Sequence, residues 1–271
     1  TLTRLLGRPK TDAEVQHAKA QLMTYSVTQD ILAHGDEFWP DDEGAYQKYK
    51  GKYWQVIFLG QFLADGRDPR IAGGVRDLLA DRKWVNNGGG QCLTANMLTA
   101  FTRLGYRDHS VVQEETEALA RRVLADGGID CEVMTYSLLP RCYMALPKLL
   151  LCFGEVPPED RSPAVSDAIE WIVQELIGHQ VYLYVPGNRK AWQEEVLARA
   201  PKRADLPPGE TVKGWLADRG NRFRTEQGMG ELEPKRGWTK FGFPLNYNSD
   251  VLEAMVALTN VGVPVSEALA K

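Results

Sequence analysis

Three cysteines and one histidine hold positions at which helical segments begin or end. They are Cys92, Cys131, Cys142 and His179. Three thiolates and an imidazole form a complete tetrahedral ligand set for zinc, which is structural when closed and catalytic when one position is open. Each residue also suits ordinary packing, because cysteine is commonly buried and a histidine can cap a helix C-terminus. We predict that the four residues meet at one end of the helices and hold a zinc ion. Because their spacing matches no zinc-finger pattern, we keep ordinary packing as the alternative.

Acidic residues in an aromatic loop are the candidates for acid–base chemistry. Asp41 and Asp42 lie in the segment FWPDDEGAYQKY, which covers residues 38–49. A carboxyl group enclosed in a cavity can act as a general acid. Two carboxyl groups that face each other across a cleft would suit a carbohydrate-active barrel. The alternative is that these acids are solvated on a loop surface.

Polar and aromatic residues on two other segments are candidates for ligand binding. Asn96 lies four residues after Cys92 on the same helical face, and Thr99 continues this polar line. A second set precedes a helical stretch near the C-terminus, namely Trp238, Phe241, Tyr247 and Asp250. Aromatic side chains at the mouth of a barrel can stack on an isoprenoid, a steroid-like ring or a sugar. They can equally plug one end of the barrel, and the polar line can equally be a packing face.

Helical periodicity dominates the chain, and apolar helices alternate with charged amphipathic ones. The spacing predicts helices over Thr11–Ala33, Tyr53–Ala64, Pro69–Asp81, Cys92–Leu104, Ser110–Ala125, Cys142–Phe153, Ser162–Ile177 and Ser249–Val261. Thr11 is the expected N-cap of the first helix, and Ser249 or Asn248 that of the last. Pro147 is expected to kink the sixth helix.

The apolar helices recur as members of helical hairpins. Four of them end at a glycine, where a left-handed C-cap is expected, namely Gly66, Gly105, Gly154 and Gly262. The apolar helix of each hairpin would belong to an inner ring and the charged helix to an outer ring. We therefore predict an all-α chain in which residues 1–271 form one α/α toroid, with an open α-solenoid as the alternative. Residues 185–240 are predicted to be an irregular insertion with one helix near Ala191–Ala200.

Four segments resemble a known family, namely YWQVIFLGQFLADGRDPRI, CLTANMLTAFTRLGY, the GGIDC turn and WTKFGFPLNYNSDVLEAMVALTNVG. Their repeat texture is similar to that of the prenyltransferase and squalene-cyclase-like repeat family. The resemblance implies an α/α toroid whose lumen binds an apolar isoprenoid-like molecule, and an activity among the transferases, lyases or isomerases. The chain lacks the terpene-cyclase motifs D-x-D-D and D-D-x-x-D. Protein prenyltransferases would imply an Asp and a Cys two residues apart as zinc ligands, whereas Asp130 and Cys131 are adjacent. The alternatives are a non-catalytic helical-repeat module with a structural zinc and a carbohydrate-active α/α barrel.

The distribution of charge limits the classes of partner. The formal net charge is −4, and acidic and basic residues are interspersed, so no basic stripe could follow a phosphate backbone. The sequence contains no apolar run of about 18 residues that would predict a membrane span. We expect a cytoplasmic protein that binds an apolar small molecule and neither binds nucleic acid nor spans a membrane. The sequence leaves the oligomeric state open.

Overall fold

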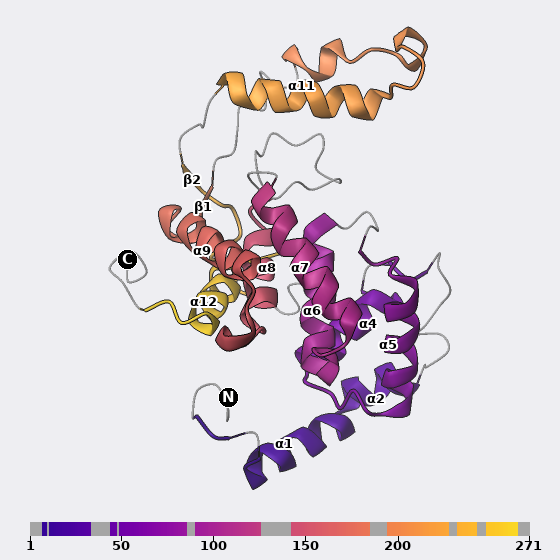
Figure 1. Cartoon of the computed structure of the whole chain (residues 1–271), viewed down its shortest axis with the longest axis vertical. Helices are drawn as coiled ribbons and strands as arrows, with labels where there is room; N and C mark the ends of the chain where they lie inside the picture. Colours follow the sequence, from indigo (N-terminus) through magenta and orange to yellow (C-terminus); the bar gives the residue numbers. More distant parts are fainter. Residues whose placement is uncertain are drawn as a thin grey trace. The chain divides into compact units, whose positions relative to one another are not determined.

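The computed structural model describes residues 7–9, 11–33, 44–47, 49–85, 90–125, 142–184, 194–227, 232–242 and 248–264. Within these ranges the chain is mostly helical, with one pair of short antiparallel strands, β1 (Leu183–Tyr184) and β2 (Glu233–Pro234) (Figure 1). The prediction of an all-α fold is therefore confirmed. The closed toroid stays a prediction.

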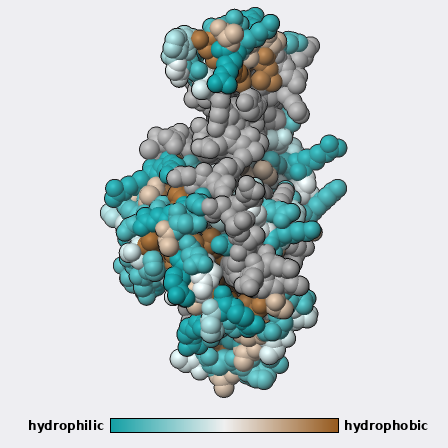
Figure 2. Space-filling view, turned by 90° about the vertical axis from the view of Figure 1, so that its right-hand side faces the viewer, coloured by the Kyte–Doolittle hydropathy of each residue, from teal (hydrophilic) through white to brown (hydrophobic). Residues whose placement is uncertain are grey.

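The contacts between residues divide the chain into two compact units. The first contains Thr1–Asn87 and Thr94–Thr116, and the second contains Gly88–Leu93 and Glu117–Lys271. The organisation as one toroid domain stays a prediction. No helix in the described ranges is long and apolar enough to cross a lipid bilayer. On the face shown in Figure 2, apolar side chains of the described residues form small groups among hydrophilic ones.

The helices of the first unit follow the predicted order. They are α1 (Ala13–Thr24), α2 (Ser26–Ala33), α4 (Lys52–Gln61) and α5 (Pro69–Asp81). Two further helices contribute residues to both units, namely α6 (Gly90–Phe101), which continues into a π-helical turn (Thr102–Tyr106), and α7 (Ser110–Ala125). Both α5 and α7 have the bounds that the sequence predicts.

The described part of the second unit contains four longer helices and three short ones. The longer helices are α8 (Ala145–Gly154), α9 (Pro163–Gly178), α11 (Val212–Gln227) and α12 (Val251–Asn260). The short 3-10 helices cover Pro158–Asp160, Leu197–Arg199 and Arg203–Asp205. Helix α11 lies inside the predicted insertion and was not expected, because polar residues occur all round it. Its apolar side chains Leu216 and Phe223 pack with Val196 in a small cluster of their own.

Close packing in the first unit joins α4 to α6 and to the turn that follows it. A Cβ atom on Gly60 would lie 2.6 Å from the Cα of Ala100, and one on Gly66 would lie 2.0 Å from the carbonyl oxygen of Leu104. The Tyr106 hydroxyl also donates a hydrogen bond to the Gly66 carbonyl at 2.7 Å. Since these contacts advance together along both segments, the two helices run parallel at a distance that only small residues permit.

The core of the second unit is formed by α8 and α12, which also run parallel. The Ser249 hydroxyl donates to the Met144 carbonyl at 2.7 Å just before the two helices begin. One turn further on, the Lys148 ammonium group bonds both carboxylate oxygens of Glu253 at 3.0 Å. The Lys148 side chain is only 1% exposed and that of Glu253 13%, so the lysine is buried between the helices and its partner largely so.

Helix α9 packs antiparallel against α8, so the two form a helical hairpin (Figure 1). The Tyr143 hydroxyl, just before α8, donates to the carbonyl oxygen of Glu175 in the last turn of α9 at 3.1 Å. Ser162 caps the start of α9 by accepting a hydrogen bond from the Val165 amide at 3.2 Å. The beginnings of α8 and α12 therefore meet the end of α9.

The first predicted helix is wrong in one respect, because Thr11–Ala33 is not continuous. Tyr25 has an extended backbone, with φ −62° and ψ 134°, and separates α1 from α2. The N-cap of α1 is Asp12 rather than Thr11, since the Asp12 carboxylate accepts from the Glu14 amide at 2.8 Å. A carboxylate next to the positive end of a helix is stabilised by the helix dipole as well as by the hydrogen bond.

Two predictions about later helices are also wrong. Helix α8 begins at Ala145 rather than at Cys142, so Pro147 lies in its first turn, where a missing amide proton requires no kink. The cap of α12 is Asp250, whose carboxylate accepts from the Glu253 amide at 2.8 Å, rather than one of the two residues before it. Both shifts leave the helices at the predicted places.

The four glycines expected to end the apolar helices fall into two classes. Gly105 and Gly262 adopt the left-handed conformation, with φ of 98° and 83°. Gly66 and Gly154 are not among the residues with positive φ. Gly66 is needed for close packing against Leu104, and Gly154 is the last residue of α8. The left-handed prediction is therefore wrong for these two.

Candidate functional site

Residues from two predicted sets lie together at one end of the second unit. The ring of His179, the C-terminal cap of α9, stacks on Tyr143 with the ring centroids 4.8 Å apart and an interplanar angle of 5°. Tyr143 also contacts Trp238, at 5.7 Å between centroids. Cys142 precedes Tyr143 in the chain and is buried. The sequence assigned Cys142 and His179 to the metal site and Trp238 to the ligand site.

Asp250 lies beside this aromatic group and has a structural role. The backbone amide of Val251 donates to the Trp238 carbonyl at 3.0 Å, which holds Trp238 next to the start of α12. Asp250 is 1% exposed, and one of its carboxylate oxygens caps the helix. Phe241 is 67% exposed, so it does not belong to the buried group. Tyr247, predicted in the same set, lies outside the described residues.

Lys235 belongs to the same end of the unit and was missed by the sequence interpretation. Its ammonium nitrogen lies 4.5 Å from the centre of the Tyr184 ring, in a cation–π contact next to the β1–β2 pair. Burial lowers the pKa of Lys235, and the neighbouring Cys142 partly opposes this shift. The pattern of a single lysine in a charged, proline-rich stretch gave no indication of this environment.

The zinc prediction depends on a residue outside the described ranges. Cys92 is buried near the start of α6 and belongs to the same unit as Cys142 and His179. Cys131 lies outside the described residues. Among the residues that the structure describes, no three His, Cys, Asp or Glu side chains are grouped so that they could hold a metal ion. The zinc site therefore stays a prediction.

Elemental analysis of protein purified without added zinc tests this prediction. If the four ligands form a site, about one zinc per chain should be present, and Cys131→Ala and His179→Ala should each lose it. Cys152→Ala is the matched control, because Cys152 is buried in α8 and is not a predicted ligand. Wild-type protein without zinc would show that these side chains serve packing alone.

Of the other predicted residues, the structure describes Asn96 and Thr99. The Thr99 hydroxyl donates to the Ala95 carbonyl of its own helix at 2.8 Å, which is a packing arrangement rather than a free polar face. Asn96 is half-buried on the same helix. Asp41 and Asp42, the predicted acid–base pair, lie outside the described residues.

A pocket of about 560 Å³ lies in the first unit, where α5 and the start of α7 approach each other. We call it the α5–α7 groove. Its apolar lining residues are Ala72, Leu79, Ala80 and Val111, and its polar ones are Arg76, Arg82, Tyr106 and His109. None of these residues was predicted as a site residue, because the charged faces of both helices suggested ordinary solvated surfaces.

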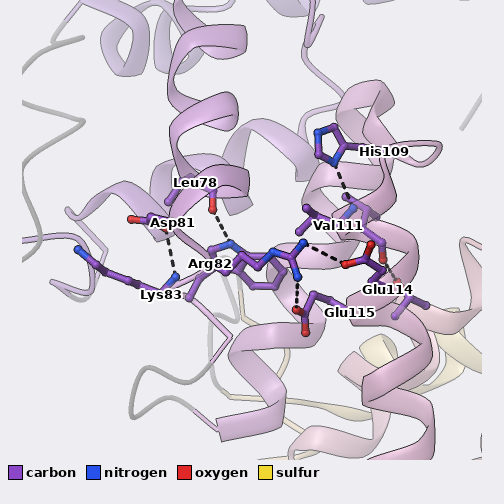
Figure 3. A network of polar contacts seen from close by, with 11 residues as sticks. Leu78, Asp81, Arg82, Lys83, His109, Val111, Glu114 and Glu115 are labelled. Carbon is purple, nitrogen blue, oxygen red and sulfur yellow. Dashed lines mark hydrogen bonds and ion pairs between the residues drawn. The ribbon is translucent and has the colours of Figure 1, made fainter.

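Arg82 ties the two sides of the groove together. It follows α5 with a left-handed backbone, φ 52°, and its guanidinium group bonds Glu114 at 3.0 Å and Glu115 at 3.4 Å (Figure 3). Both acids belong to α7. The positive charge of Arg82 is therefore already balanced by two carboxylates.

His109 and Arg76 provide the polar groups that remain at the groove. The amide of Val111 donates to Nδ1 of His109 at 3.3 Å, so the neutral imidazole carries its proton on Nε2. Arg76 is exposed and has no ion pair with any described residue. Burial raises the pKa of Tyr106, and the positive charge of Arg76, which lines the same groove, partly opposes this shift.

Comparisons with known proteins give no family for this chain. The resemblance to prenyltransferase-like and squalene-cyclase-like repeats thus stays an expectation from sequence texture. No protein-family model matches the chain, and neither a curated protein nor a solved structure matches it.

Proposed function

We propose that this chain is a non-catalytic helical-repeat binding protein that takes an apolar small molecule into the α5–α7 groove. The observation that carries the proposal is the groove itself, because about 560 Å³ falls within the range typical of small-ligand sites. Its wall of alanine, leucine and valine side chains offers apolar contact, and the two alanines leave room for a ligand.

The groups around the groove suit binding better than catalysis. Arg82 is engaged by two carboxylates, and the Tyr106 hydroxyl donates to a backbone carbonyl. Among the described residues of the groove, no nucleophile is hydrogen-bonded to a general base, which is the usual arrangement for covalent catalysis. A pre-formed apolar wall with a few polar groups at its edge is the ordinary pattern of a ligand site.

The proposal keeps the ligand class that the family resemblance implies but changes its place. The resemblance implies a lumen formed by the apolar helices, whereas the groove is formed by the two charged ones. The isoprenoid-binding enzyme and the carbohydrate-active barrel stay predictions. The barrel requires Asp41 and Asp42, which lie outside the described residues.

Titration calorimetry with 1-decanol tests the proposed function. The wild-type chain should bind this neutral apolar probe, and Ala80→Trp, which fills the groove, should weaken binding at least about tenfold. Asp77→Trp is the matched control, because it adds the same ring to an exposed position of α5 outside the groove. Absence of binding to wild type, or equal binding by Ala80→Trp, would contradict the proposal.

A further inference from the structure

Among the described residues that line the α5–α7 groove, Arg76 is a cation without an ion pair. Asp65 pairs with Arg67 at 2.9 Å and Asp68 pairs with Arg70 at 2.7 Å, so both acids have their own arginine. These contacts lower the pKa of each carboxyl group, which keeps both of them ionised and paired. Neither acid therefore neutralises Arg76, which lines the groove one helical turn after Ala72.

Arg82 cannot take the same role without breaking contacts. Its guanidinium group already bonds Glu114 and Glu115, which tie the end of α5 to α7. A ligand that recruited Arg82 would leave two acids without their partner. Arg76 has no such competitor among the described residues and can bind an oxyanion with two parallel hydrogen bonds.

His109 supplies a second donor at the same groove. Its Nδ1 is occupied by the Val111 amide, so Nε2–H remains the donor of the neutral ring. Figure 3 shows the His109 ring apart from the Arg82 network, with its marked contact directed to Val111. The ring also stands at the start of a sixteen-residue helix, whose positive end favours an anion.

We infer that the groove binds an amphipathic acid, with its oxyanion on Arg76 and His109 and its apolar chain against Leu79 and Val111. This inference rests on the proposed function and adds the chemical class of the ligand. The oxyanion can be a carboxylate or a phosphate monoester, since each presents two oxygens that can accept two parallel hydrogen bonds from a guanidinium group. The pairing requires no group beyond the residues that line the pocket.

Parallel titrations with decanoate, decyl phosphate and 1-decanol test the inference, because the three share one chain and differ in the head group. At least one acid should bind the wild-type chain about tenfold or more tightly than 1-decanol. Arg76→Gln should remove this difference between the acids and 1-decanol, because the oxyanion loses its charged partner. Arg122→Gln, which changes an exposed arginine of α7 outside the groove, should keep the difference.

The outcomes separate the inference from the proposed function. Equal binding of the acids and 1-decanol would overturn the inference alone, whereas failure of all three probes to bind would overturn both. An acid preference that survives in both Arg76→Gln and His109→Ala would also overturn it. Preference for only one of decanoate and decyl phosphate would identify the oxyanion. Far-ultraviolet circular dichroism and thermal unfolding of each variant show that the exposed substitutions keep the fold.

Discussion

Replacing Lys148 with methionine is expected to lower the free energy of unfolding by about 3 to 5 kcal/mol. Lys148 is buried between α8 and α12, where its ammonium group bonds both oxygens of Glu253 and the Asn248 carbonyl. Methionine fills a similar volume but leaves the largely buried Glu253 carboxylate without its partner, and the cost of its desolvation dominates the result. Urea unfolding followed by far-ultraviolet circular dichroism measures the loss.

A second substitution distinguishes the buried charge from a packing defect. The double variant Lys148→Met with Glu253→Leu should recover most of the stability, because an apolar pair replaces an ion pair without leaving a charge behind. Arg222→Met is the control for an exposed pair, since Arg222 and Asp218 on α11 are both largely exposed and should contribute less than about 0.5 kcal/mol. A loss below about 1 kcal/mol in Lys148→Met would mean that solvent reaches Glu253.

The helices could be predicted where the information is local. The bounds of α5 follow from Asp68 and Pro69, a cap and a first-turn proline that stand next to an amphipathic stretch. Helix α11 was missed because its apolar residues are few and form a cluster with Val196, which lies sixteen residues before the helix begins. Periodicity within one segment cannot reveal a partner that lies outside it.

The candidate sites show the same division between local and distant information. His179 and Trp238, which the sequence assigned to two separate sets, lie in one group because Tyr143 contacts both rings. The ion pair of Lys148 with Glu253 joins residues 105 positions apart, and a single sequence cannot indicate such a pairing. The groove likewise combines Arg76 of α5 with His109, which directly precedes α7. Arg76 can be recognised as available to a ligand only once Asp65 and Asp68 are known to pair with other arginines.

The close packing of α4 against α6 continues in the segments that follow the two helices. There it gives the second large expected effect. Gly66→Ala should lower the free energy of unfolding by about 3 kcal/mol, the upper end of the usual cost of overpacking. The new Cβ would lie 2.0 Å from the Leu104 carbonyl oxygen, and a backbone atom cannot move aside as the end of a flexible side chain can. Urea unfolding compared with wild type measures the difference.

Gly73→Ala separates this steric effect from a general effect of removing a glycine. Gly73 lies within α5, and a Cβ there would meet no atom within 4 Å. Alanine at that position should stabilise the chain by about 0.5 to 1 kcal/mol, because it has the higher helix propensity. If both variants changed stability by the same amount, backbone freedom would explain the result and the close approach to Leu104 would be wrong. If Gly66→Ala alone is destabilising, the parallel packing of the α4 and α6 segments depends on a position that tolerates no side chain.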